Sequence, residues 1–380
     1  MSVFGHIQSW IKRRVDLVFS PRASYVQARP WDPELPLISV VIPCYNHGDV
    51  LEGAVDSVLE GTWQDVEILV VNDGSEDPDT LSSLAAFSRP KSRVMDHDRN
   101  QGLPAARNTG ISQARGKYIC CLDADDKLHP TYLEKAICLL ESNQGIDLVY
   151  AWTQVFGDED RVWYAPQFDP AEIIHHNQLN PPGVFRRAAW EDVGGFREEM
   201  RQGYEDWEFW IRLARAGYRG YRIPEKLIYV RREGRSFIHQ AQERHEQLVR
   251  DIQHYNPDVY EDDSWLKYVA RKTGNVYVRE PFLNIKSRIS FRTLKDPLLW
   301  IQREAPRNIK FTIEDMRHKN CQHEGDLVVV CTTPVEEEMQ DLLYGETAYV
   351  YILPHFLPRY VWDKFIDEVM IALRGATVVG

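Results

Sequence analysis

The stretch that decides the fold is Tyr118-Ile119-Cys120-Cys121-Leu122-Asp123-Ala124-Asp125-Asp126. Its first half is an apolar run typical of a buried strand, and its second half places three carboxylates directly after that strand. Carboxylates this close repel one another unless a cation lies among them. Hard ions such as Mg²⁺ and Mn²⁺ take oxygen ligands, usually one or two carboxylates together with nucleotide phosphates. The stretch therefore predicts a metal site for a nucleoside diphosphate, and the simpler alternative is that Asp125 or Asp126 caps a following helix.

Two strand-and-loop units precede this stretch. Leu37–Pro43 is a β-branched run ended by proline, and an apolar-periodic helix over Leu51–Leu59 follows it. Val66–Val71 is a second predicted strand, and it leads into Asn72–Ser75, where glycine permits a tight turn. Ligands of open α/β sheets collect at the carboxyl ends of strands. We therefore expect Asp73 to stand at that edge of the sheet.

A third unit has the same form. Arg93–Met95 is a short predicted strand, and Asn100–Asn108 is a glycine turn that leads into a helix with proline in its first turn. On this reading Arg107 lies near the phosphates of the ligand, which its guanidinium can bind bidentately.

These motifs resemble those of the glycosyltransferase family 2 enzymes of the GT-A fold, which transfer a sugar from a nucleotide-sugar donor with inversion. The resemblance covers roughly residues 38–236. It implies an α/β protein with a Rossmann-like mixed sheet flanked by helices. Several motifs in the expected order carry the resemblance: Val41–Asn46, Val71–Ser75, Asn100–Gly102, Ala106–Asn108, Leu122–Asp126, Gly194–Phe196 and Gly203–Trp207.

The resemblance also implies roles for individual residues. The implied nucleotide-binding residues are Pro43, Tyr45, Asp73, Asn100, Gly102, Arg107, Asp123 and Arg232. Asp73 would accept hydrogen bonds from the base, usually uracil, and Asp123 would face the ribose. Asp125 would hold the Mn²⁺ or Mg²⁺ ion that bridges the diphosphate, and Asp126 would ligate the metal, cap the next helix, or do both. The metal would act as a Lewis acid on the leaving diphosphate.

A second acidic pair, Glu205-Asp206, precedes a predicted helix that starts at Trp207. The resemblance implies that this pair is catalytic and that Asp206 is the base, which takes the proton of the acceptor hydroxyl as that oxygen attacks the anomeric carbon. The alternative is that both acids only stabilise a helix N-terminus.

One position departs from the family pattern. Arg232 stands where many relatives carry a histidine near the metal or diphosphate. Arginine cannot ligate a metal, but its guanidinium can bind phosphate oxygens. His239 is an alternative ligand, and the third metal ligand stays open.

Composition narrows the class of protein. A chain of 380 residues with 43% hydrophobic content can form one large domain and a smaller one. Its net charge of −12 argues against a nucleic-acid partner. The six cysteines lack the paired spacing of metal fingers, which predicts reduced core residues in a cytoplasmic protein. No apolar run is long enough to cross a bilayer and no signal peptide is visible, so any membrane contact is peripheral, at the inner face of the membrane.

Three segments are expected. Residues 1–36 form an amphipathic segment that lies on an anionic membrane surface or packs on the catalytic domain or on a partner subunit of a homo-oligomer. Residues 37–255 form the catalytic domain. Residues 256–380 are helical and then alternate strands and helices, which predicts the start of a second α/β domain in a chain cut from a longer protein. That domain is a second transferase or an accessory domain for dimerisation.

The predicted function is a metal-dependent inverting glycosyltransferase that moves a sugar from a UDP-sugar to a glycan or lipid-linked acceptor in polysaccharide biosynthesis. A nucleotidyltransferase is one alternative, but it needs a basic glycine-rich phosphate loop, and Cys44–Gly48 contains neither Lys nor Arg. The other is a catalytically inactive carbohydrate-binding or scaffold protein of the same fold. The intact carboxylates Asp73, Asp123, Asp125 and Asp206 argue against it.

Overall fold

The computed structural model of the chain describes residues 38–143, 145–234, 237–261, 298–302, 327–347, 349–357, 362–373 and 377–379. The predicted amphipathic segment 1–36 lies outside the described residues. No helix in the described ranges has the length and apolar character that crossing a membrane requires.

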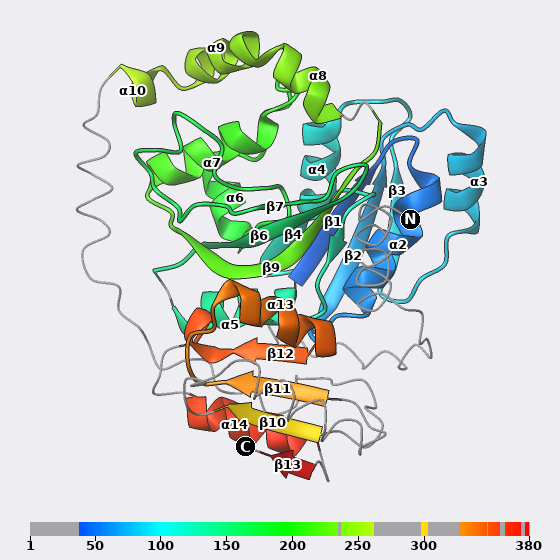
Figure 1. Ribbon diagram of the computed structural model, residues 1–380. Coiled ribbons are helices and arrows are strands. Elements are labelled where there is room, and N and C mark those ends of the chain that lie inside the picture. The colour runs from blue at the N-terminus through cyan, green and yellow to red at the C-terminus, as the bar shows by residue number, and fades with distance from the viewer. Residues whose placement is uncertain are drawn as a thin grey trace, which may run out of the picture.

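The first part of the chain forms a nine-stranded mixed sheet in the order β3-β2-β1-β4-β8-β6-β9-β5, with β7 paired to β6 (Figure 1). The strands are β1 Ile38–Cys44, β2 Val66–Asn72, β3 Ser92–Asp96, β4 Tyr118–Cys121, β5 Lys127–Leu128, β6 Leu148–Gly157, β7 Arg161–Trp163, β8 Val184–Arg186 and β9 Gly220–Arg232. The strands β1 to β4 pair in parallel, and β8 joins β4 and β6 antiparallel to both. The carboxyl ends of β1, β2 and β4 therefore meet at one edge of the sheet.

Helices cover both faces of this sheet, so β1 and β2 are buried along their whole length. The helices are α2 Gly48–Leu59, α3 Pro78–Ala86, α4 Leu103–Ser112, α5 Tyr132–Ser142, α6 Arg187–Val193, α7 Glu205–Ala216, α8 Phe237–Glu243, α9 His245–Tyr255 and α10 Pro257–Tyr260. Alternate side chains of β1 point to opposite faces. Val40 packs with α2 and α5, whereas Val41 packs with α4 and α7.

The C-terminal part forms a second sheet of four parallel strands. Its elements are β10 Leu298–Gln302, β11 Leu327–Cys331, α13 Glu337–Glu346, β12 Tyr349–Ile352, the 3₁₀ turn η1 Leu353–His355, α14 Trp362–Ala372 and β13 Thr377–Val379. The order β12-β11-β10-β13 repeats the order β3-β2-β1-β4 of the first sheet, each strand taking the place of its counterpart along the chain. Gly345 still belongs to α13, and β12 begins at Tyr349.

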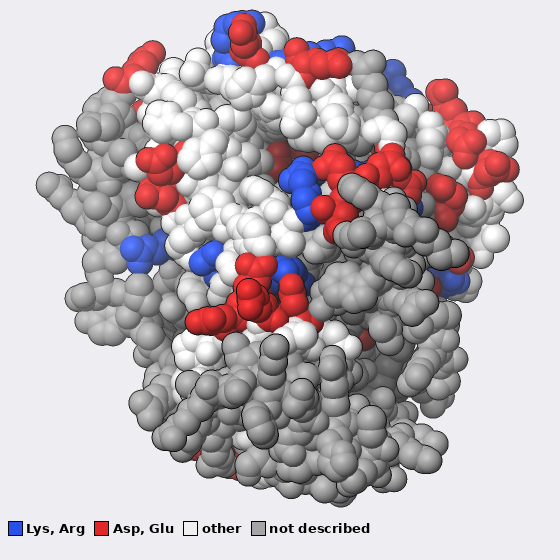
Figure 2. Space-filling model, in the orientation of Figure 1, with Lys and Arg blue, Asp and Glu red and all other residues white. Residues whose placement is uncertain are grey.

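The two sheets are joined by buried and surface charges. Lys135 of α5 and Glu225 of β9 are fully buried and form an ion pair at 2.7 Å. Glu225 also bonds Tyr344 of α13 and, at 3.2 Å, His355 of η1. At the surface, the acidic group at the centre of Figure 2 lies over α13, where Lys226 pairs with α13 carboxylates. The C-terminal part is thus bonded directly to β9 of the first sheet and to α5, which packs against that sheet.

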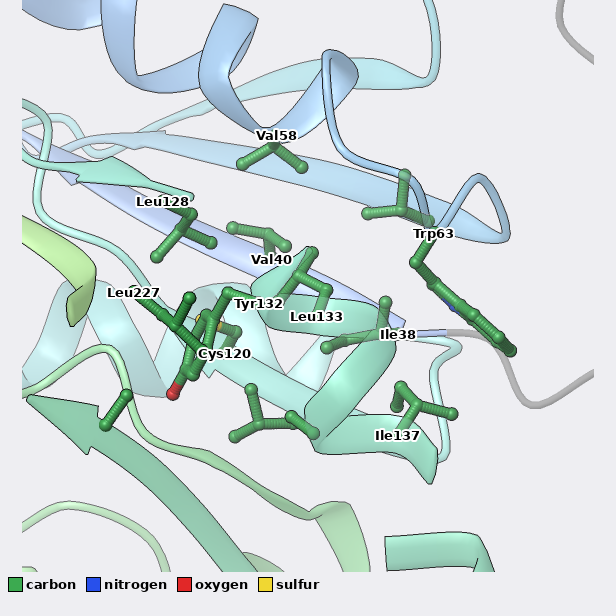
Figure 3. Close-up of a cluster of buried hydrophobic side chains, with 14 of the residues drawn as sticks. Ile38, Val40, Val58, Trp63, Cys120, Leu128, Tyr132, Leu133, Ile137 and Leu227 are labelled. Atoms are coloured by element: carbon green, nitrogen blue, oxygen red, sulfur yellow. The ribbon is translucent and has the colours of Figure 1, made fainter. Parts of the chain in front are cut away.

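A continuous apolar core accompanies these charges. Figure 3 shows side chains of α2, β1, β4 and α5 meeting in one cluster, among them Val58, Val40 and Leu133. The same cluster extends to buried residues of the C-terminal part, including Leu299 and Phe365. The expected fold class, an α/β fold with a mixed sheet flanked by helices, is confirmed. The expected domain boundaries stay a prediction.

Candidate functional site

Asp123, Asp125 and Asp126, the acidic cluster, lie in the turn between β4 and β5. The Asp126 backbone N–H donates to the Asp123 carbonyl oxygen at 3.1 Å, which closes the turn and brings the carboxylates together. Asp126 is buried and Asp125 is half-buried. Burial raises the pKa of Asp125, and burial raises the pKa of Asp126 well above its usual range, with further increases from neighbouring carboxylates. Burial and the neighbouring carboxylates thus disfavour the charged forms of Asp125 and Asp126, and nearby positive charge offsets this effect only in part.

A divalent cation fits this donor set. Asp125 and Asp126 supply hard oxygen ligands, and a cation beside them would stabilise the charged forms that burial and the neighbouring carboxylates disfavour. Among the described residues, no three His, Cys, Asp or Glu side chains are grouped as a complete metal site. Mg²⁺ and Mn²⁺ need no such group when substrate phosphates complete the ligand set. The third protein ligand therefore stays open.

Asp126 also links the cluster to β9. Its Oδ1 accepts the Arg231 backbone N–H at 2.9 Å. The suggestion that it caps the next helix is wrong, because α5 starts after Thr131 as its N-cap residue. The neighbouring Arg232 is half-buried, its Nη1 donates to the Arg231 carbonyl oxygen at 2.8 Å, and its charge lowers the pKa values of Asp125 and Asp126. Arg232, which stands in place of the expected histidine, thus puts a positively charged side chain beside the acidic cluster.

Asp73 lies at the carboxyl end of β2, as expected, but it is buried and bonded within the protein. Its Oδ1 accepts the Gln101 N–H at 2.8 Å and lies 2.7 Å from His97 Nδ1, and its Oδ2 accepts the Gly102 N–H at 2.8 Å. His97 in turn lies 2.9 Å from the Thr109 hydroxyl on α4. These bonds hold the loop before α4 and leave little acceptor capacity for a base, so base binding by Asp73 stays a prediction.

The remaining nucleotide-binding candidates lie around the same edge. Pro43 is buried in β1, and Tyr45 just beyond it is 41% exposed. Gly102 precedes α4 with φ +97°, a conformation that favours glycine. Asn100 accepts hydrogen bonds at 3.2 Å from Arg201, through both its backbone and its side-chain oxygen.

Arg107 has partners within the protein that the sequence analysis did not assign. It was predicted to bind the donor phosphates, but its side chain is fully buried, packs over the Phe196 ring and bonds to two carboxylates. Nη2 donates to Asp123 Oδ1 at 2.8 Å, and Nη1 donates to Glu205 Oε1 at 2.6 Å. Although burial alone would lower the pKa of Arg107, these carboxylates raise it. Arg107 therefore joins the acidic cluster to the Glu205-Asp206 pair.

That pair lies in the first turn of α7, which begins two residues earlier than the predicted start at Trp207. Tyr204 precedes it in the left-handed conformation, φ +61°, which is rare for a bulky residue and turns the chain into the helix. Glu205 and Asp206 are 4% and 8% exposed. Burial raises the pKa of Glu205 to about 7 against the lowering effect of Arg107, and burial also raises the pKa of Asp206.

Two residues of this region were missed by the sequence analysis. His97 follows the carboxyl end of β3, so the rule that ligands collect at strand ends would have found it. Asn177 donates from Nδ2 to Asp206 Oδ2 at 2.9 Å. It lies in an irregular segment without a recognisable motif, and no sequence signal points to it.

Residues 39–207 match the sequence model of the family described as glycosyl transferase family 2. The chain is 41% identical over 160 residues to the uncharacterized glycosyltransferase YibD of Escherichia coli, covering 41% of this chain and 43% of YibD. It is 28% identical over 268 residues to the hyaluronan synthase of Pasteurella multocida, covering 63% of this chain and 26% of the synthase. The chain thus spans less than half the length of each of these relatives.

Among solved structures, S. aureus TarS 1-349 in complex with UDP-GlcNAc is similar with a TM-score of 0.46 and 21% identity, covering 53% of this chain and 60% of TarS 1-349. The mannosyltransferase PcManGT from Pyrobaculum calidifontis, in complex with GDP-Man and Mn²⁺, has a TM-score of 0.45 and 17% identity, covering 71% of this chain and 82% of PcManGT.

Proposed function

From the membership of residues 39–207 in glycosyl transferase family 2, we propose that this protein is a metal-dependent, inverting glycosyltransferase. Its donor is a nucleotide-sugar, a UDP-sugar by the family pattern, and its acceptor is a glycan or a lipid-linked glycan in polysaccharide biosynthesis. Two relatives with 28% identity, named hyaluronan synthase and chondroitin synthase, support the polysaccharide as product class.

The observation that carries this proposal is the bridge made by Arg107. A transferase needs the group that neutralises the leaving diphosphate and the group that deprotonates the acceptor on either side of one anomeric carbon. One buried guanidinium contacts Asp123 of the first motif at 2.8 Å and Glu205 of the second at 2.6 Å. The two acidic motifs, 79 positions apart between Asp126 and Glu205 in the sequence, are therefore parts of one site.

In this site Asp206 accepts the proton of the acceptor hydroxyl. Its burial raises its pKa, and a carboxylate with a raised pKa is a stronger base. Asp125, with Asp126, would hold the Mg²⁺ or Mn²⁺ ion, which supplies a positive charge for the departing diphosphate. Asp123 would orient the ribose, and Arg232 beside the acidic cluster would contact phosphate oxygens.

The experiment compares Asp125→Ala and Asp206→Asn with the wild type. Nucleotide binding is measured as the rise in unfolding temperature with nucleoside diphosphates and nucleotide-sugars, each with Mn²⁺, Mg²⁺ or EDTA. Turnover is measured as release of the nucleoside diphosphate. We expect Asp125→Ala to lose metal-dependent binding and turnover together, because the diphosphate loses its counter-ion. Asp206→Asn keeps its shape, so it should bind the donor normally and lose at least about 100-fold in kcat.

The two variants check each other. Equal loss of donor binding in both would contradict the separate roles. A wild type that shows no temperature shift with any nucleotide, with or without metal, would favour the inactive scaffold over the transferase.

A further inference from the structure

Asn177 lies in the irregular segment between β7 and β8, and its amide contacts the proposed base directly. Nδ2 donates to Asp206 Oδ2 at 2.9 Å. Oδ1 of the same amide accepts the Leu179 backbone N–H at 3.2 Å. This second bond assigns the orientation of the amide, because only the oxygen can accept and only the nitrogen can donate. Asn177 therefore presents an N–H group to Asp206.

The segment that carries Asn177 is itself held in place. The Trp207 side chain donates from Nε1 to the Ile173 carbonyl oxygen at 2.5 Å, and the Tyr260 hydroxyl donates to the Ile174 carbonyl oxygen at 2.9 Å. Trp207 is the residue after Asp206, and Tyr260 belongs to α10. The chain before Asn177 is thus bonded to the helix that carries the base, which sets the position of the amide relative to the carboxylate.

The charges around Asp206 show why this hydrogen bond matters. Glu205 lies beside it on α7, Asp123 at the end of β4, and Arg107 on α4. Burial raises the pKa of Asp206, whereas Arg107 and the Asn177 hydrogen bond lower it, and Asp123 raises it. The Arg107 guanidinium donates to Asp123 and Glu205. In the described part of the chain, Asn177 is the side chain that donates to Asp206 itself.

We propose that Asn177 is a positioning residue for the base, holding the Asp206 carboxylate in one orientation and in its charged form through the bond between Nδ2 and Oδ2. This role rests on the proposed function, since Asp206 is a base only if the protein is a transferase. Asn177 would act through Asp206 and not on the donor.

The test is Asn177→Ala with Asn180→Ala as the matched control. Asn180 lies in the same segment, is similarly half-buried, and donates to the Thr153 hydroxyl at 2.9 Å instead of to Asp206. Turnover is measured across a pH range as nucleoside diphosphate release, with the nucleotide-sugar that the wild type uses. Unfolding temperatures check that both variants are folded.

We expect Asn177→Ala to lower kcat roughly 10- to 100-fold, the usual effect of losing a hydrogen bond to a charged group, with the donor KM within about twofold. Without the hydrogen bond from Asn177, the charged form of Asp206 is less favourable, so the pKa of Asp206 rises. The acid side of the kcat profile should then move to higher pH. Asn177→Gln, which keeps an amide donor, should recover part of the loss, and Asn180→Ala should change neither kcat nor the profile.

The outcomes separate this role from the proposed function. An active wild type and an inactive Asp206→Asn, together with an unshifted pH profile in Asn177→Ala, would overturn the role of Asn177 and leave the transferase intact. Equal losses in Asn177→Ala and Asn180→Ala would also overturn it. Full activity in Asp206→Asn would show that Asp206 is not the base. A wild type inactive with every nucleotide-sugar would contradict the transferase. Either result would also overturn the role of Asn177.

Discussion

At the residue scale, Arg107 supplies one buried positive charge to two motifs. Its side chain is fully buried, whereas Asp123 is 31% exposed and Glu205 is 5% exposed at the side chain. A guanidinium suits this position because its donors are arranged in a planar fork that reaches two carboxylates at once. Removing it would leave buried negative charge without a partner, which is more costly than the loss of the ion pair alone.

We therefore predict that Arg107→Met destabilises the protein by about 3–5 kcal/mol. The measurement is urea unfolding at neutral pH. Arg161→Met is the control, because Arg161 is 56% exposed and its pair with Glu159 lies at the surface. The control should cost less than about 1 kcal/mol. Similar losses in both variants would contradict a special role for the buried bridge.

At the scale of elements, α4 positions the site because it lies very close to β1 and β2. Gly110 makes this approach possible: a Cβ atom there would lie 2.3 Å from Val41 Cγ1 and 3.2 Å from Val71 Cγ2. Both valines are fully buried and cannot move aside. The close approach places Arg107, one turn earlier on α4, in the interior.

Gly110→Ala is accordingly predicted to destabilise the protein by about 1–3 kcal/mol, although alanine favours helices. Gly53→Ala on α2 is the control, since its Cβ would meet only the flexible end of Lys127 at 3.3 Å. That change should be neutral or stabilising by up to about 1 kcal/mol. The measurement is the free energy of unfolding of both variants in urea. The double variant Gly110→Ala/Val41→Ala should recover part of the stability that Gly110→Ala loses.

At the scale of the whole molecule, the C-terminal sheet is attached through buried polar groups. Lys135 and Glu225 have no exposed side-chain area, and Lys135 lowers the pKa of Glu225 to about 2 against the effect of burial. Tyr344 and His355 of the C-terminal part complete the partners of Glu225. The attachment thus depends on a buried charge of the first part, Glu225, whose partners come from both parts.

Lys135→Met should therefore cost about 3–5 kcal/mol in urea unfolding, because Glu225 keeps a buried charge without its cation. The double variant Lys135→Met/Glu225→Gln removes that charge and keeps an acceptor for Tyr344, so it should be more stable than the single variant. If the double variant is the less stable of the two, the uncompensated charge is not the cause.

Glu134 gives the same interface a dependence on pH. It is buried, with hydrogen bonds from Thr62 at 2.6 Å and from Tyr351 of β12 at 3.0 Å, and burial raises its pKa to about 6. Its pKa is about 4.3 in an unfolded chain. Between these values the folded protein binds more protons than the unfolded one, so this group lowers stability as pH rises toward 6 and keeps it lower above that pH.

Glu134→Gln keeps an acceptor and removes the charge. We expect it to raise the free energy of unfolding at pH 8 by about 1–2 kcal/mol and to leave it nearly unchanged at pH 4. Urea unfolding at both values is the measurement. An equal change at pH 4 and pH 8 would show that packing, and not ionisation, is responsible.

Much of the fold could be predicted from local patterns. Apolar runs that end at proline, a glycine turn or acidic residues predicted β1, β2 and β4, because such patterns reflect burial on both faces of a sheet. The helix after Gly102 was predicted from its turn and its proline. Helix starts were less accurate: α7 begins at Glu205 because the left-handed Tyr204 turns the chain there, and no local pattern indicates that turn.

The candidate site was predicted in part, since the motif residues lie at the expected strand and helix ends. Phosphate binding by Arg107 stays a prediction, and its two carboxylate partners were missed, because its local pattern shows a helix start but not which carboxylates fill the interior beside it. The order of strands in the second sheet could not be predicted from local patterns either. The same holds for the bonds of the C-terminal part to Lys135 and Glu225, because these features depend on residues far apart along the chain.

The sequence by itself determined most of the strands and helices around the site and the acidic motifs, because these depend on the order and chemistry of neighbouring residues. Only the tertiary structure decided that Asp73 holds a loop, that Asn177 bonds the proposed base, and that one arginine joins both motifs. The physical reason is burial. A buried charge or donor must find its partner in three dimensions, and the identity of that partner follows from the packing of helices on the sheet, which no local pattern contains.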